Sequence, residues 1–195
     1  MSAAAVSAIV LAGGRSSRFG RDKLAEPLAG RTLLDHAIAA VILIATETIV
    51  VSPPDETPTV PRGVVVVHDH IAFEGPLVGL LAGLRAATNP LAIVVAGDMP
   101  TMVASLLEAL IARLADPAID AVVLEVDGLS RPLPAALRTA PAAAAAERLV
   151  AAGERRLRAI VEALPMAVID EPAWRLLDPD GTTLRDVDTP SDLPQ

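Results

Sequence analysis

From position 11 the chain reads Leu11-Ala12-Gly13-Gly14-Arg15-Ser16-Ser17-Arg18-Phe19-Gly20-Arg21-Asp22-Lys23, directly after an apolar run over residues 6–11 that is typical of a buried β-strand. Glycines at such a turn let the backbone adopt positive φ and approach a ligand closely. The backbone N–H groups of the turn then form a cradle for phosphate oxygens. Lys23, the only lysine among 16 basic residues, adds a compact positive charge beyond the loop. The stretch therefore predicts a strand and a basic loop that bind a nucleotide triphosphate.

The spacing of this loop excludes two common phosphate-binding motifs. The P-loop requires Gly, four residues and then Gly-Lys-Ser/Thr, but Gly20 is followed by Arg21. The dinucleotide fingerprint requires G-x-G-x-x-G, which Gly13, Gly14 and Gly20 do not supply. The loop is therefore of another kind.

Composition sets the broad class of the protein. With 195 residues, of which 52% are hydrophobic, the chain fits one domain spanning residues 1–195 with a sizeable core. A net charge of −8 argues against a broad nucleic-acid-binding surface, and the absence of cysteine excludes disulfides and thiolate catalysis. No apolar run reaches the roughly 18 residues that span a membrane, and no basic region precedes Ala3–Val6 as in a secretory signal. We therefore expect a cytoplasmic protein that binds neither nucleic acid nor a membrane.

Apolar, β-branched runs alternate along the chain with segments of helical periodicity. This alternation predicts an α/β fold with a doubly wound, mostly parallel sheet. Strands are expected at Ala8–Leu11, Thr48–Val51, Val64–His68, Leu91–Val95, Ala121–Leu124 and Met166–Ile169. Helices are expected at Thr32–Ile44 with a capping box at Thr32 and Asp35, and at Pro76–Ala87, Thr101–Leu114, Pro141–Ala152 and Glu154–Leu164, while Pro172–Thr183 is expected to be irregular. Ligands of such sheets bind beyond the carboxyl ends of the strands, where the motif loops of this chain lie.

Asp98 follows a very apolar stretch, Leu91–Val95, at the predicted carboxyl end of a strand. Nucleotidyl transfer needs a divalent cation that bridges phosphate oxygens and neutralises developing charge. Because Mg²⁺ is usually held by one or two carboxylates together with substrate phosphates, Asp98 is the first candidate for a magnesium ligand. The alternative is an N-cap for the helix that starts near Thr101, although Pro100 stands between them.

The loop at 11–23 resembles the L-A-G-G-x-S-x-R-x-G-x-x-K signature of the sugar-nucleotide-like nucleotidyltransferases, and every fixed position of that signature is met. Within this superfamily it is most similar to the molybdenum cofactor guanylyltransferases, over essentially the whole chain. The resemblance implies a Rossmann-like nucleotidyltransferase fold in which the backbone from Leu11 to Gly14 binds the nucleotide. It also implies catalytic roles for Arg18 and Lys23, which would stabilise the β- and γ-phosphates, and for Asp98, which would contact both nucleotide and metal.

Arg185-Asp186-Val187-Asp188-Thr189-Pro190 is similar to the D-x-D-T-P segment that brings a second polar ligand to the metal in this family. The matching position is Asp188, so the resemblance implies that Asp98 and Asp188 hold Mg²⁺ together. The apolar residue between two acids predicts a short strand with Asp186 and Asp188 on one face. A solvated acidic tail is the alternative.

A third segment reads His68-Asp69-His70-Ile71-Ala72-Phe73-Glu74-Gly75-Pro76-Leu77-Val78-Gly79 and resembles the family's D-x(n)-P-G-x-G-P-L-x-G-L, although the first Pro-Gly is missing and Glu74 is present instead. The resemblance implies that Asp69 contacts the nucleotide and that Gly75, Pro76 and Gly79 line the base and ribose. Gly75-Pro76 also suits the first turn of a helix. The two histidines beside the carboxylate are either a metal pair or, with no third ligand nearby, solvated loop residues.

Ser130–Leu137 is similar to the Q-P-L-x-A-L segment that borders the acceptor site in this family, but Arg131 replaces the glutamine. Arg131 either binds an acceptor phosphate in a bidentate way or is an ordinary surface residue. A second basic group, Arg155, Arg156 and Arg158, either binds an anionic pterin or covers a helix face.

The function that the resemblance implies is Mg²⁺-dependent transfer of GMP from GTP to the molybdopterin-type molybdenum cofactor, with release of pyrophosphate. A molybdoenzyme or a chaperone would then be the protein partner. L-A-G-G followed by G-P-L-x-G favours guanine over cytosine. One alternative is a cytidylyltransferase or another nucleotidyltransferase that acts on a different phosphorylated small molecule. The other is a non-catalytic nucleotide-binding accessory protein, which the departures at Glu74 and Arg131 suit but the intact Lys23 and Asp98 do not.

Overall fold

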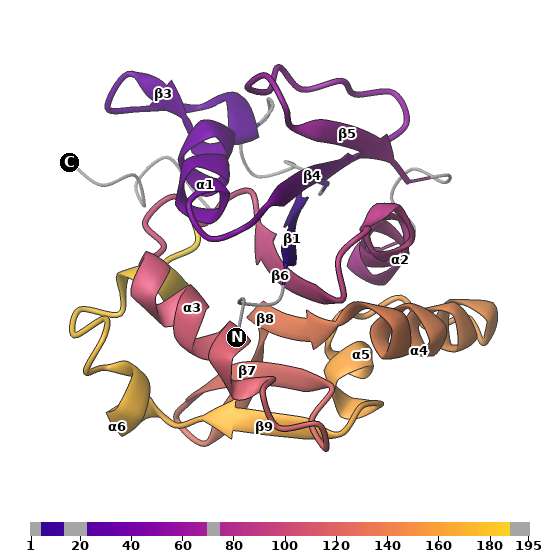
Figure 1. The fold of residues 1–195 in the computed structure, drawn as a ribbon. Coiled ribbons are helices and arrows are strands. Elements are labelled where there is room, and N and C mark those ends of the chain that lie inside the picture. Colours follow the sequence, from indigo (N-terminus) through magenta and orange to yellow (C-terminus); the bar gives the residue numbers. More distant parts are fainter. Residues whose placement is uncertain (1–4, 14–22, 70–74, 188–195) are drawn as a thin grey trace.

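A seven-stranded sheet forms the centre of the computed structural model, which describes residues 5–13, 23–69 and 75–187. Its strand order is β5-β4-β1-β6-β8-β7-β9 (Figure 1). The strands are β1 (Val6–Leu11), β4 (Glu47–Ser52), β5 (Val65–His68), β6 (Leu91–Ala96), β7 (Ala121–Val126), β8 (Leu129–Arg138) and β9 (Met166–Ile169). Every pairing is parallel except those of β8 with β6 and with β7. The predicted α/β fold with a mostly parallel sheet is therefore confirmed.

Helices cover both faces of the sheet (Figure 1). One face carries α1 (Leu33–Ile42), α3 (Ala104–Arg113) and α6 (Glu171–Trp174), and the other carries α2 (Pro76–Ala86), α4 (Thr139–Ala151) and α5 (Arg158–Glu162). Strands with both faces covered are apolar along their whole length rather than alternating. This explains the run at residues 6–11, where every side chain of β1 is buried.

Short elements flank the first helix. The 3₁₀-helix η1 (Lys23–Ala25) precedes a small antiparallel hairpin of β2 (Pro27–Leu28) and β3 (Arg31–Thr32). The capping box predicted for α1 is present: the Asp35 N–H donates to Thr32 Oγ1, and the Thr32 N–H donates to the Asp35 carboxylate. This cap satisfies two N–H groups that a helix otherwise leaves without partners.

Strand β8 was not predicted, because its Pro132 and Pro134 remove two ladder donors and argue against a strand. The structure accommodates both prolines in a bulge. Val123 of β7 pairs with Ala135 and the next residue, Leu124, pairs with Arg131, so the three residues between Arg131 and Ala135 have no partner on β7.

Three further expectations were wrong in detail. Helix α3 starts at Ala104 rather than Thr101. The helix expected at Glu154–Leu164 is only the five residues of α5, because the Glu154 carboxylate binds the Arg155 and Arg156 N–H groups and holds the chain in a loop. The region expected to be irregular contains α6 and the 3₁₀-helix η2 (Thr182–Leu184).

Within the part of the chain that the structure describes, no helix combines the length and the apolar character needed to cross a bilayer.

Helix α2 packs closely on β1 because position 83 is glycine. A Cβ atom there would lie 2.6 Å from Ile9 Cγ2 and 3.0 Å from Val51 Cγ2. Gly79, one turn earlier, is less restricted: a Cβ there would lie 3.6 Å from Val51 Cγ1, an ordinary contact.

We therefore expect Gly83→Ala to lower the free energy of unfolding by about 1–3 kcal/mol, because the added methyl overpacks the core. Gly79→Ala is the matched control. It should be neutral, or stabilising by up to about 1 kcal/mol, since alanine is the better helix former. Urea unfolding of both variants checks this, and equal destabilisation of the two would contradict the packing argument.

Candidate nucleotide site

The carboxyl ends of β1, β4, β5 and β6 meet at one edge of the sheet, where backbone hydrogen bonds continue beyond the strands. The Ala12 N–H donates to the Val51 carbonyl at 2.8 Å, and the Gly97 N–H donates to the Leu11 carbonyl at 3.0 Å. Because β4 and β5 lie on one side of β1 and β6 lies on the other, the direction of winding reverses here. Ligands of doubly wound sheets bind at this kind of crevice.

Lys23 and Asp98, which are 75 positions apart, form an ion pair in this crevice, with 2.8 Å between Nζ and Oδ2. Their side chains are largely buried, at 13% and 26% exposure. Gly97 permits the approach of η1, because a Cβ there would lie 3.2 Å from Leu24 Cδ1. Lys23, at the end of the glycine-rich loop, therefore contacts the acid that follows β6.

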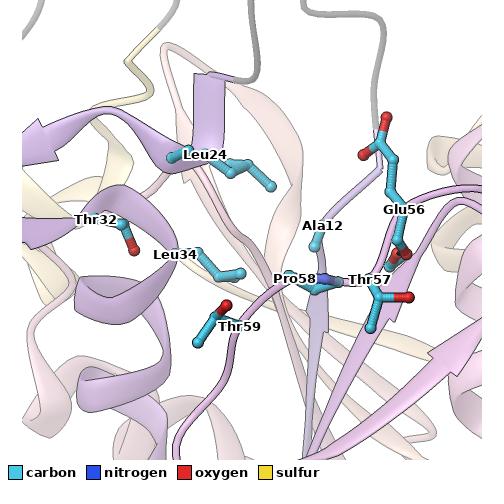
Figure 2. A pocket seen from close by; sticks show the side chains of 10 residues that line it. Ala12, Leu24, Thr32, Leu34, Glu56, Thr57, Pro58 and Thr59 are labelled. Carbon is cyan, nitrogen blue, oxygen red and sulfur yellow. Dashed lines mark hydrogen bonds between the residues drawn. The ribbon is translucent and has the colours of Figure 1, made fainter.

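A pocket of about 520 Å³ opens beside Ala12, on the α1 side of β1. Figure 2 shows Leu24, Thr32 and Leu34 on one side of it, opposite Ala12, Glu56 and Thr57. Gly13 lies against the ring of Pro53, with 3.8 Å between Pro53 Cδ and the Cβ position of Gly13. Ala12 thus borders a cavity that is lined by apolar and hydroxyl side chains and by the acid Glu56.

On the α2 side, Asp69 continues β5, and its N–H donates to the Ser52 carbonyl at 3.1 Å. Its Oδ2 lies 3.9 Å from the Cβ position of Gly79, so this acid faces the first turn of α2. Gly75 has φ +107° and a Cβ there would lie 2.8 Å from the Arg155 carbonyl oxygen, two reasons why a larger residue is excluded. Pro76 is the first residue of α2, as predicted.

A second pocket, of about 380 Å³, lies beside Asp98 on the side of β6 that faces β8. It results from the bulge in β8. Residues Leu91 to Val94 of β6 pair with β8, but Val95 and Ala96 do not, because Pro132 to Pro134 leave the ladder. The space that remains is lined by Ala96, Asp98, Met99, Arg131, Pro132, Leu133, Leu184 and Asp186. We call it the β8 pocket. It brings together Asp98, Asp186 and Arg131, which the sequence separates widely.

The donor set suits a magnesium ion. Carboxylate oxygens are its preferred protein ligands, and it takes few of them because phosphates and water complete the shell. Asp98 and Asp186 both line the β8 pocket. Among the described residues no group of three or more His, Cys, Asp or Glu gathers as in an all-protein cage.

Comparison with known proteins identifies the family. A family model described as "MobA-like NTP transferase domain" matches residues 8–168. The chain belongs to this family.

Relatives and solved structures agree with this assignment. A "probable molybdenum cofactor guanylyltransferase" of Chloroflexus aggregans is 36% identical over 193 residues, which are 96% of this chain and 91% of that protein. One of Mycobacterium tuberculosis is 40% identical over 164 residues, 81% of this chain and 80% of that protein. The crystal structure of molybdopterin-guanine dinucleotide biosynthesis protein A from Archaeoglobus fulgidus has the same fold, with a TM-score of 0.79 and 24% identity over 96% of this chain and 94% of that one. This MobA-like transferase is accordingly a nucleotidyltransferase.

The described structure brings together many of the residues singled out from sequence. Leu11, Ala12, Gly13, Lys23 and Asp98 lie around the crevice between β1 and β6. Val103, not Asp98, is the N-cap residue of α3, so the helix-cap alternative for Asp98 is wrong. Three predicted residues, Gly14, Arg18 and Asp188, lie outside the described residues.

Two other predicted features also have defined places. The His68 ring lies 3.1 Å from the Pro53 carbonyl oxygen, while His70 lies outside the described residues. Arg156 is 79% exposed and pairs with Glu154, and this contact lowers the pKa of Glu154 to about 2. The Arg155 carbonyl accepts the Leu77 N–H, so the loop with these arginines packs against the start of α2.

The short strand predicted around Asp186, in the segment that crosses the end of β6, is wrong. Residues 185–187 form no strand; instead the Val187 N–H donates to the Asp98 carbonyl at 3.1 Å, and the Val187 side chain is buried. A turn before it is held by Asp178, whose carboxylate accepts the Thr182 N–H, the Thr182 hydroxyl and the Thr183 N–H at 2.7–3.0 Å. An acid followed by two threonines four and five residues later was the signal available in the sequence.

Asp178 is 2% exposed. Burial raises the pKa of its carboxyl, but the hydrogen bonds from Thr183 and Thr182 outweigh burial and bring the pKa below its ordinary value of 3.8. An acid whose pKa is lower in the folded state stabilises the fold fully above its unfolded pKa and loses that contribution as pH falls through the folded pKa.

We therefore expect the wild type to exceed Asp178→Asn in unfolding free energy by a constant margin above about pH 5, and the margin to shrink as pH falls below about 4. Chemical unfolding at a series of pH values measures it. A margin that grows with acidity would show that the carboxylate is not the stabilising form.

Proposed function

We propose that this MobA-like transferase transfers GMP from GTP to the molybdopterin-type molybdenum cofactor and releases pyrophosphate. The observation that carries the proposal is the meeting of the phosphate loop, through Lys23, with Asp98 in the crevice between β1 and β6. The names of relatives at 36% and 40% identity support the choice of donor and acceptor.

In the proposed reaction a phosphate oxygen of the acceptor attacks the α-phosphorus of GTP. The new P–O bond forms as the bond from that phosphorus to the bridging oxygen breaks, and pyrophosphate carries away the electron pair. No protein nucleophile is needed, so the chain's own contribution is positioning and charge stabilisation. Bound Mg²⁺ would supply neutralisation of phosphate charge, held by Asp98 with Asp188.

The protein residues would divide the work by location. The backbone from Leu11 to Gly14 binds the phosphates, and Arg18 and Lys23 stabilise the charge that develops on the leaving pyrophosphate. Asp69, Gly75, Pro76 and Gly79 bind the base and ribose on the α2 side. The ion pair of Lys23 with Asp98 supports this division, because an arriving phosphate offers Lys23 another partner and leaves the Asp98 carboxylate to a cation.

The β8 pocket is where we place the acceptor. It lies beside β8, whereas Asp69 follows β5 on the other side of β6, so two substrates would flank the same carboxylate. Arg131 lines it, and the guanidinium makes no hydrogen bond or ion pair within residues 5–13, 23–69 and 75–187. A cation with five donors in an open pocket suits a phosphate.

The proposal is tested by incubating the protein with Mg²⁺, the reduced molybdopterin-type molybdenum cofactor, and either GTP or CTP. Pyrophosphate release with GTP alone supports the proposal. Release with CTP favours a cytidylyltransferase, and nucleotide binding without turnover favours an accessory role; either result overturns the proposal.

Asp98→Asn should abolish turnover while leaving the fold intact, because the neutral amide is a poor magnesium ligand. Lys23→Ala should lower the rate roughly 10²–10³-fold, as expected when one preorganised charge is removed. Initial rates of pyrophosphate release measure both. Glu108→Gln, on the exposed face of α3, is the control, and near-normal turnover by Asp98→Asn would remove this acid from the metal site.

Arg131→Ala should raise KM for the acceptor about tenfold or more, because a charge-assisted hydrogen bond contributes roughly 1.5–3 kcal/mol. KM for GTP should not change. Arg148→Ala, an exposed arginine on α4, is the matched control. An unchanged acceptor KM would make Arg131 an ordinary surface residue.

A further inference from the structure

The segment from Asp178 to Val187 connects α6 with the end of β6 through hydrogen bonds, and we name it the strap. Its first anchor is α6: the Asp178 N–H donates to the carbonyl of Trp174, whose side chain is 1% exposed. Its last anchor is the Asp98 carbonyl, which accepts the Val187 N–H. The strap therefore reaches from the core to the candidate metal ligand.

The turn within the strap is built around the Asp178 carboxylate. Its Oδ1 accepts from the Thr182 N–H and hydroxyl, and its Oδ2 accepts from the Thr183 N–H. Gly181 takes φ +63°, which closes the turn. A buried carboxylate is costly unless it is well hydrogen-bonded, so these three donors hold the turn in one shape.

Two hydrogen bonds connect the turn around Asp178 to the start of α3. The Thr101 hydroxyl donates to the Thr182 carbonyl at 2.7 Å, and the Val103 N–H donates to Thr183 Oγ1 at 3.0 Å. Val103 is the N-cap of α3, and the segment 97–103 leads to it directly from Asp98. Both ends of the loop that carries Asp98 thus touch the strap.

We propose that Asp178 is a positioning residue for the candidate metal site. By holding the turn in one shape, it sets Val187 against Asp98 and so determines where Asp186 stands relative to the Asp98 carboxylate. Asp186 precedes Val187 and lines the β8 pocket together with Asp98. The metal-binding part of the inference rests on the proposed function, whereas the positioning of Val187 does not.

The test compares Asp178→Asn and Thr183→Val with Thr183→Ser and Asp170→Asn. In Asp178→Asn an amide NH₂ faces N–H donors, and Thr183→Val removes the acceptor for Val103, whereas Thr183→Ser keeps it. Asp170 lies outside the strap and caps α6 by accepting the Ala173 N–H, so Asp170→Asn controls for the change from carboxylate to amide at an acid that accepts a backbone N–H.

The first readout is hydrogen exchange of the peptide amides at 185–187. We expect faster exchange there in Asp178→Asn and Thr183→Val, and wild-type exchange in Thr183→Ser and Asp170→Asn. Should Asp178→Asn fail to fold, Thr183→Val and its serine counterpart decide the matter. Wild-type protection in a folded Asp178→Asn or in Thr183→Val would overturn the proposal.

The second readout is Mn²⁺ affinity by calorimetry, with a GTP analogue whose α,β-bridge is methylene. We expect roughly tenfold weaker binding in Asp178→Asn and Thr183→Val, by analogy with other residues that orient metal ligands, and unchanged affinity in the two controls. Equal weakening in Asp170→Asn would reduce Asp178 to a structural role. If the wild type binds no Mn²⁺, the proposed function fails, and the exchange data still decide whether Asp178 positions Val187.

Discussion

The parallel pairing of β1 with β6 is the interaction on which the candidate site depends. Six residue pairs, from Val6 with Leu91 to Leu11 with Ala96, set the register, and the hydrogen bond from Gly97 to Leu11 extends it into the loops. Because side chains alternate along strands, a slip of one residue would exchange the faces of β6 and carry Asp98 away from the phosphate loop. The buried core thus determines the separation between the loop and the acid.

Sequence periodicity was sufficient for the elements that bury a continuous apolar face. β1, β4, β6 and β7 were found because both-sided burial leaves unbroken aliphatic runs. The edge strands β5 and β9 were found because they are short runs of apolar, β-branched residues, and α1 was found because caps have a specific chemistry. β8 was not predicted because its prolines disfavour a strand locally. Only pairing with the neighbours on both sides, β6 and β7, makes an extended chain favourable there. Tertiary pairing outweighed local preference.

In the candidate site, too, some residues could be predicted from the sequence and others could not. The glycine-rich loop and the acid after an apolar strand pointed to Gly13, Lys23 and Asp98, because ligands of such sheets bind beyond the carboxyl ends of the strands. Asp69 was named through the family resemblance. The strap and the β8 pocket were not predictable, since they arise from contacts between segments about 80 positions apart, such as Thr101 with Thr182. No periodic pattern in one chain records a pairing at that distance.

The bulge in β8 also bears on the entropy of binding. Pro132 and Pro134 have no N–H to donate. A regular ladder of hydrogen bonds from β8 to Val95 and Ala96 therefore cannot form and close the β8 pocket. If the β8 pocket holds the acceptor, as proposed, a cavity that exists before binding needs little reorganisation, and the ordering cost that usually weakens small-molecule affinity is small. Pro132 and Pro134, which interrupt the ladder of β8, thereby preorganise the β8 pocket.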